Sequence, residues 1–161
     1  MYQKDRRRTA ALYIGGGLAF VLCLGVIVFL IWSMAMKNSY RDLCLEINDA
    51  ILAAPAGSCT IGRGENEYPA DADTLDYYDR FLLAERVMPY SRRPVPADDR
   101  TIILSIGAGR QLLLTGIEGD TAVNLRWITP EGEQSYTVRA TTVSFSQLSA
   151  YYANLSRRGT Q

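Results

Sequence analysis

The chain has 161 residues, with 17 basic and 17 acidic side chains, three cysteines and no histidine. No basic block follows the N-terminal tail, which argues against nucleic-acid binding. The absence of histidine excludes His-based catalytic triads and removes the commonest metal ligand. We therefore predict a non-enzymatic protein without catalytic residues, metal or cofactor.

An uncharged run from Thr9 to Met36 follows a basic tail, residues 1–9, that contains Lys4 and three arginines. Residues 10–36 are predicted to form a transmembrane helix, because the run exceeds the ~20 residues needed to cross a bilayer. The basic tail favours a cytoplasmic N-terminus and export of residues 37–161. A cleaved signal peptide is the alternative, although its apolar stretch usually has only ~7 to 15 residues.

Small residues recur every four positions in the apolar run, at Ala11, Gly15, Ala19 and Cys23. This spacing places them on one helical face, where a second membrane helix could approach closely. The pattern predicts helix packing against another membrane protein or a second copy of the chain. The alternative is that it reflects only the general abundance of Gly and Ala in membrane helices.

Residues 37–161 are enough for one exported domain with its own core. Apolar residues at helical spacing from Tyr40 to Ile51 predict that the membrane helix continues outward as a stalk, which ends before Pro55. Residues 58–73 are polar and rich in Gly, Asp and Glu, and are predicted to form a loop.

A second helix is predicted from Asp73 to Met88, with Asp73 or Thr74 as its N-cap and Pro89 after its end. Residues 91–100 contain two alternate prolines and are predicted to be an extended connector. Strands are predicted at 101–106, 111–117, 122–128 and 134–144, with the short turns that antiparallel neighbours allow.

The last two predicted strands alternate apolar and polar residues, which predicts one buried and one solvated face. A final helix is predicted from Ser144 or Ser146, ending at Arg157 to Gly159. The predicted fold class is therefore α+β: an N-terminal transmembrane helix continuing into a stalk helix, then a helix, a four-stranded antiparallel meander and a C-terminal helix.

Two cysteines, Cys44 and Cys59, lie in the exported part. In an oxidising compartment they are predicted to form a disulfide. The alternative is a pair of buried free thiols, because two cysteines alone do not establish pairing.

Aromatic residues of the exported part, namely Tyr77, Phe81, Trp127 and Tyr151, are a possible ligand or partner face. The alternative is that they pack in the core. A concave apolar cavity beside them would favour a small ligand, whereas a filled core with an exposed apolar edge or patch would favour a protein partner.

Short motifs occur at Gly107-Ala-Gly109, Leu114-Thr-Gly116, Tyr136-Thr-Val-Arg139 and Val143-Ser-Phe145. With them, the segment from Ile103 to Phe145 resembles the FidL-like group of small single-pass proteins. The resemblance implies a bacterial inner-membrane protein whose periplasmic, β-rich domain accompanies a membrane-bound transcriptional activator of the ToxR type. It implies an accessory protein that acts through protein contacts.

Two other function classes compete with a regulator's accessory subunit. One is an extracytoplasmic small-ligand sensor, and the other is a pilin-like or secretion-machine structural subunit. A type IV pilin also joins an apolar N-terminal helix to an antiparallel sheet. However, no glutamate lies five residues into the apolar run after a basic leader that ends in glycine.

Overall fold

The computed structural model describes residues 2–55, 57–83, 87–117, 119, 121–140 and 144–158. Side chains are described over the same ranges except at residues 2–15, 87, 140 and 158. The chain divides into two compact units, Met1–Met36 and Lys37–Gln161. Helix α1 (Tyr2–Ala53) begins in the first unit and ends in the second.

The first unit is helical from Tyr2 onward, and its apolar side chains from Leu18 to Ala35 are exposed, whereas Met36 at its end is buried. Leu18, Val28 and Ile31, for example, are 64%, 63% and 63% exposed. Within the described part of α1, Gly16–Ala53, the mean hydropathy of an 18-residue window reaches 2.7. The helix is therefore long and apolar enough to cross a membrane. Exposed apolar surface of this extent is unfavourable in water and favourable in a bilayer.

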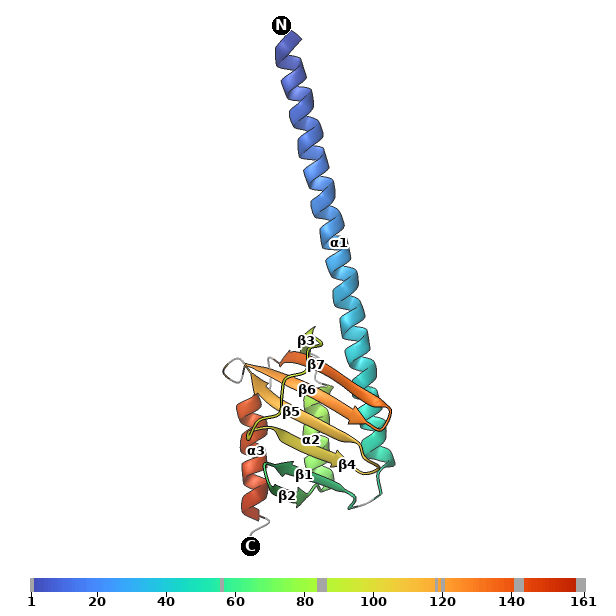
Figure 1. The fold of residues 1–161 in the computed structure, drawn as a ribbon, viewed down its shortest axis with the longest axis vertical. Helices are drawn as coiled ribbons and strands as arrows, with labels where there is room; N and C mark the ends of the chain where they lie inside the picture. Colours follow the sequence, from blue (N-terminus) through green and yellow to red (C-terminus); the bar gives the residue numbers. More distant parts are fainter. Residues whose placement is uncertain are drawn as a thin grey trace. The chain divides into compact units, whose positions relative to one another are not determined.

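The second unit contains a sheet of seven strands in its described residues, ordered β2-β1-β4-β5-β6-β7-β3 with every neighbouring pair antiparallel (Figure 1). The strands are β1 (Cys59–Arg63), β2 (Asn66–Pro69), β3 (Val87–Ser91), β4 (Ile102–Ile106), β5 (Gln111–Ile117), β6 (Ala122–Thr129) and β7 (Gly132–Ala140).

Three helical segments cover one face of this sheet: α2 (Ala72–Leu82), α3 (Phe145–Arg158) and the part of α1 after Met36. The ring of Tyr40 in α1 lies 5.6 Å from the ring of Tyr136 in β7. In α2, Tyr78 donates a hydrogen bond to the carbonyl of Leu148 in α3, at 3.2 Å. The core between the layers includes Ile47, Phe81, Leu112, Trp127 and Leu148, each at most 1% exposed.

The opposite face of the sheet is crossed by residues 92–100, which we call the strap (Figure 1). Asn124 of β6 holds it in place. The Asn124 side chain accepts a hydrogen bond from the amide of Val95, at 3.1 Å, and donates one to the carbonyl of Arg93, at 3.0 Å. The prediction that this face is solvated was therefore wrong at Asn124 and Thr137, which are buried, whereas Arg139 on the same face is exposed.

Over the described residues the sheet has seven strands and not the four predicted. The predicted loop at 58–73 contains the hairpin of β1 and β2, with Gly64 at a φ of +59° in its turn. This segment carries little apolar signal of its own. It becomes a strand pair because β1 lies against the apolar strand β4, where Ile61 pairs with Leu104.

The third additional strand, β3, replaces the end of the predicted second helix. Helix α2 stops at Leu82, and Met88 and Pro89 lie in β3 at the edge of the sheet, where proline is tolerated. The N-cap of α2 is Asp71, whose side chain accepts a hydrogen bond from the Thr74 amide at 2.9 Å. The four predicted strands and the last helix occur near their predicted bounds, as β4 to β7 and α3.

Candidate functional site

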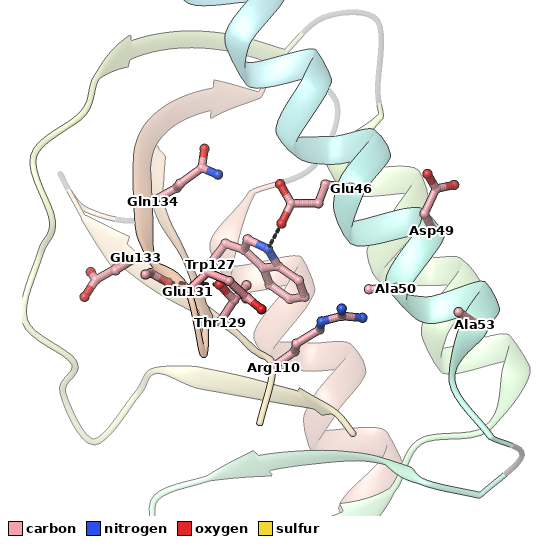
Figure 2. Close-up of a pocket in the computed structure, with 11 residues that line it drawn as sticks. Glu46, Asp49, Ala50, Ala53, Arg110, Trp127, Thr129, Glu131, Glu133 and Gln134 are labelled. Atoms are coloured by element: carbon pink, nitrogen blue, oxygen red, sulfur yellow. Dashed lines mark hydrogen bonds between the residues drawn. The ribbon is translucent and has the colours of Figure 1, made fainter. Parts of the chain in front are cut away.

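An open cleft of about 730 Å³ lies between the last turns of α1 and the hairpin of β6 and β7 (Figure 2). We call it the acidic cleft, because four carboxylates and one guanidinium are among its lining groups. Its lining consists of Glu46, Asp49, Ala50, Ala53, Arg110, Trp127, Thr129, Glu131, Gly132, Glu133 and Gln134.

Trp127 and Glu46 connect the two walls of the acidic cleft. The indole Nε1 of Trp127 donates a hydrogen bond to Glu46 Oε1 at 2.8 Å, which Figure 2 shows as a dashed line. Trp127 is only 1% exposed, whereas Glu46 is exposed. The sheet thus positions the indole, and the indole fixes the Glu46 carboxylate at the cleft wall.

Neighbouring groups lower the pKa of two further carboxylates of the acidic cleft, those of Glu131 and Glu133. Arg126 bonds Glu133 through two guanidinium nitrogens, at 2.7 and 3.1 Å, and these bonds lower the pKa of the Glu133 carboxyl. A hydrogen bond from Thr129 lowers the pKa of Glu131. Both carboxylates are therefore ionised at neutral pH, and the cleft suits a cationic group.

A second cleft, of about 690 Å³, is more apolar. We call it the apolar groove. It lies where the end of α1, the β1–β2 hairpin, the start of α2 and the end of α3 meet. Its lining consists of Ile51, Ala54, Pro55, Gly57, Cys59, Tyr68, Pro69, Ala70, Asp71, Ala72, Leu75 and Leu155. Leu52, next to Ile51 in α1, is 76% exposed.

The four predicted aromatic residues do not form one face. Tyr77 and Tyr151 stack in parallel, with ring centroids 3.9 Å apart, where α2 meets α3. Phe81 is buried in the core, and Trp127 lies at the acidic cleft. Burial raises the pKa of the Tyr77 hydroxyl, with a further contribution from Tyr151. The Tyr77–Tyr151 pair thus packs two helices together.

The predicted disulfide is not formed in the structure, in which Cys44 and Cys59 are both free and buried. The Cys44 thiol donates a hydrogen bond to the Leu82 carbonyl at 3.5 Å, and the Tyr40 hydroxyl bonds the same carbonyl at 3.0 Å. Cys59 begins β1 and lines the apolar groove. Burial raises the pKa of the Cys44 thiol to about 11, so this thiol is protonated at neutral pH.

The predicted packing ridge lies on α1, whose helical backbone includes all four of its positions. Ala19 and Cys23 are exposed, while the side chains of Ala11 and Gly15 lie outside the described residues. Spacing of four residues keeps these positions on one helical face. Packing against a second helix stays a prediction.

Metal binding has no candidate in the described residues, where no group of three or more Cys, Asp and Glu side chains is arranged to hold an ion. Sequence reasoning missed the acidic cleft. A signal was present, because Glu46, Asp49, Ala50 and Ala53 follow the spacing of one helical face. The carboxylates from the β6–β7 turn could be added only once the fold was known.

Comparison of the chain with protein-family models, curated proteins and solved structures found no match.

Proposed function

We propose that the chain is a non-enzymatic, single-pass membrane protein whose domain after Met36 binds a protein partner. The N-terminus is cytoplasmic and the domain is periplasmic, in a bacterial inner membrane. The membrane assignment is supported by the long apolar helix α1 and by the basic residues before it.

The apolar groove is the observation that carries the partner proposal. Its floor and rim present Ile51, Leu75 and Leu155 to the surface, each partly exposed, with Leu52 beside them. Exposed apolar surface of this kind is typical of protein-binding sites. The core next to it is filled by large buried side chains, which is the arrangement that favours a protein partner over an enclosed ligand.

Within this class, we infer an accessory subunit of a membrane-bound regulator, as the FidL-like resemblance implies. The resembling motifs lie at the β4–β5 turn, in β5 and in β7. Val143 lies outside the described residues. A structural subunit of an envelope complex is the broader form of the same proposal.

A small cationic ligand in the acidic cleft is the second candidate. It is favoured by the carboxylates of Glu46, Asp49, Glu131 and Glu133 around an aromatic wall. Calorimetric titration of the full chain in detergent with an organic cation such as spermidine tests it. If spermidine binds and the Glu46→Gln substitution weakens that binding, a ligand sensor is supported. If no heat of binding is measured, this candidate is removed.

A photo-crosslinking amino acid at Ala72 tests the partner proposal, because Ala72 lines the groove and is exposed. The matched control carries the same amino acid at Arg80, which lies on the same helix with its side chain 78% exposed. In native membranes we expect a discrete adduct from position 72 and none from position 80. Equal labelling at both positions, or no adduct at either, would contradict the proposal.

A further inference from the structure

An exposed corner of the second unit combines apolar and basic side chains around the edge strand β3. Met88 is 56% exposed and Tyr90 is 39% exposed. The guanidinium of Arg139 lies 5.7 Å from the ring centroid of Tyr90, and Arg92 and Arg93 follow β3 directly with exposed side chains. We call Met88, Tyr90, Arg92, Arg93 and Arg139 the β3 corner.

The pairing of β3 with β7 explains why these side chains gather. Met88 pairs with Arg139, whereas the next residue, Pro89, pairs with Val138, which is completely buried under the helices. Since side chains alternate between the faces of a sheet, Met88 and Arg139 point away from the helices. Exposed Met and Tyr side chains beside arginines form a surface that suits the boundary between hydrocarbon and lipid headgroups.

The β3 corner adjoins the residues of α1 that directly follow the apolar run. Tyr136 of β7 shares a 2.6 Å hydrogen bond with Ser39, and the guanidinium of Arg92 lies 5.2 Å from the Tyr136 ring centroid. Ser39 comes three residues after Met36, which is about 4.5 Å along a helix. Headgroups extend about 5 to 7 Å beyond the hydrocarbon on each side of a bilayer. Ser39 therefore falls at headgroup depth when Met36 lies at the edge of the hydrocarbon.

We propose that the β3 corner binds the headgroups of anionic phospholipids, with its arginines on the phosphates and Met88 and Tyr90 at the acyl boundary. The inference rests on the membrane anchor of the proposed function but is independent of the protein partner and of the apolar groove. The contact gives the domain a second, electrostatic attachment to the bilayer in addition to the transmembrane helix. It would make the domain's position sensitive to lipid composition and ionic strength.

The experiment is amide hydrogen exchange on the full chain in lipid nanodiscs, made of phosphatidylcholine alone or mixed with phosphatidylglycerol. We expect the amides of Met88 and of residues 90–93 to exchange more slowly with phosphatidylglycerol present, and added salt to reverse the effect. Each surface arginine adds about fivefold to binding of an anionic membrane. Arg92→Gln with Arg93→Gln should therefore remove most of the protection.

The matched control is Arg80→Gln with Arg157→Gln, which removes two exposed arginines outside the corner and should keep the protection. Amide exchange that does not depend on phosphatidylglycerol would overturn the proposal. An equal loss of protection in the control variant would also overturn it. Protection that increases with protein density and not with lipid charge would also overturn it, in favour of a second copy of the chain. Extraction of the chain by alkaline carbonate would instead refute the membrane anchor itself.

Discussion

Asn124 shows how a single polar residue can organise one face of a sheet. It is completely buried, and its amide nitrogen donates to the Thr137 hydroxyl at 2.9 Å and to the Arg93 carbonyl at 3.0 Å. Its amide oxygen accepts from the Val95 amide. The side chain therefore pairs two part-buried backbone groups of the strap and the buried Thr137 hydroxyl, and leaving such polar groups without partners is costly.

Asn124→Ala should lower the free energy of unfolding by about 2 to 3 kcal/mol, because several buried polar groups lose their partner at once. The measurement is urea denaturation of the full chain in detergent, followed by circular dichroism. Asn154→Ala, at an exposed position of α3, is the control and should change stability by less than about 0.5 kcal/mol. An equal effect of the two substitutions would refute the organising role of Asn124.

The buried Cys44 thiol should make the free energy of unfolding depend on pH. Its thiol pKa rises from 9.0 to about 11 on folding, chiefly through burial. Between these values the unfolded chain releases a proton that the folded chain retains. Stability should therefore fall above pH 9, by up to about 1.4 kcal/mol per pH unit. Denaturation series at pH 8, 9 and 10 measure this slope, and Cys44→Ala should reduce it. An unchanged slope in Cys44→Ala would assign the effect to other groups, such as Tyr40.

At the scale of elements, the sequence pattern predicted the helices and strands that have a clear apolar periodicity of their own. The meander β4 to β7 and helix α3 have clear apolar periods, and Gly107 to Gly109 lie in the short turn predicted between the strands at 101–106 and 111–117. The hairpin of β1 and β2 was missed because its strand character comes from pairing with β4. Strand β3 was missed because Pro89 indicates a chain break as readily as an edge strand. The acidic cleft was missed for a related reason, since its carboxylates meet only after the sheet forms.

Gly64 is predicted to specify the β1–β2 turn, because its φ of +59° is unfavourable for residues with a Cβ atom. Gly64→Val should lower the free energy of unfolding by about 1 to 2 kcal/mol. Gly64→Asn should cost less, since asparagine tolerates this conformation better. Urea denaturation of both variants measures the difference. Because open space surrounds Gly64, a larger loss with Asn than with Val would contradict a conformational cause.

For the whole molecule, the two units imply a division of roles. The first unit has apolar side chains that suit a bilayer, and the second has a filled core with two clefts and a basic corner on its surface. In the proposed function, the anchor restricts the domain to one membrane face. Confinement raises the effective concentration of the domain near a membrane-bound partner, so that a weak groove contact suffices.

The proposed topology follows from charge at the ends of the apolar run, where Lys4 and Arg6 to Arg8 lie before it and Lys37 and Arg41 lie after it. Basic residues are retained in the cytoplasm, so the richer N-terminal side should stay inside. Alkaline phosphatase, which is active only outside the cytoplasm, should therefore be active when fused after Gln161, and green fluorescent protein exported through the same pathway should be dark.

Replacing the three tail arginines by glutamine leaves Lys4 against Lys37 and Arg41, which removes the N-terminal excess and should reduce phosphatase activity per expressed molecule. Lys37→Gln with Arg41→Gln is the matched control and should leave that activity unchanged or higher, because it increases the asymmetry. A fusion that is expressed but inactive in the parent chain would reverse the topology and place the second unit, with its groove and β3 corner, against the cytoplasmic leaflet.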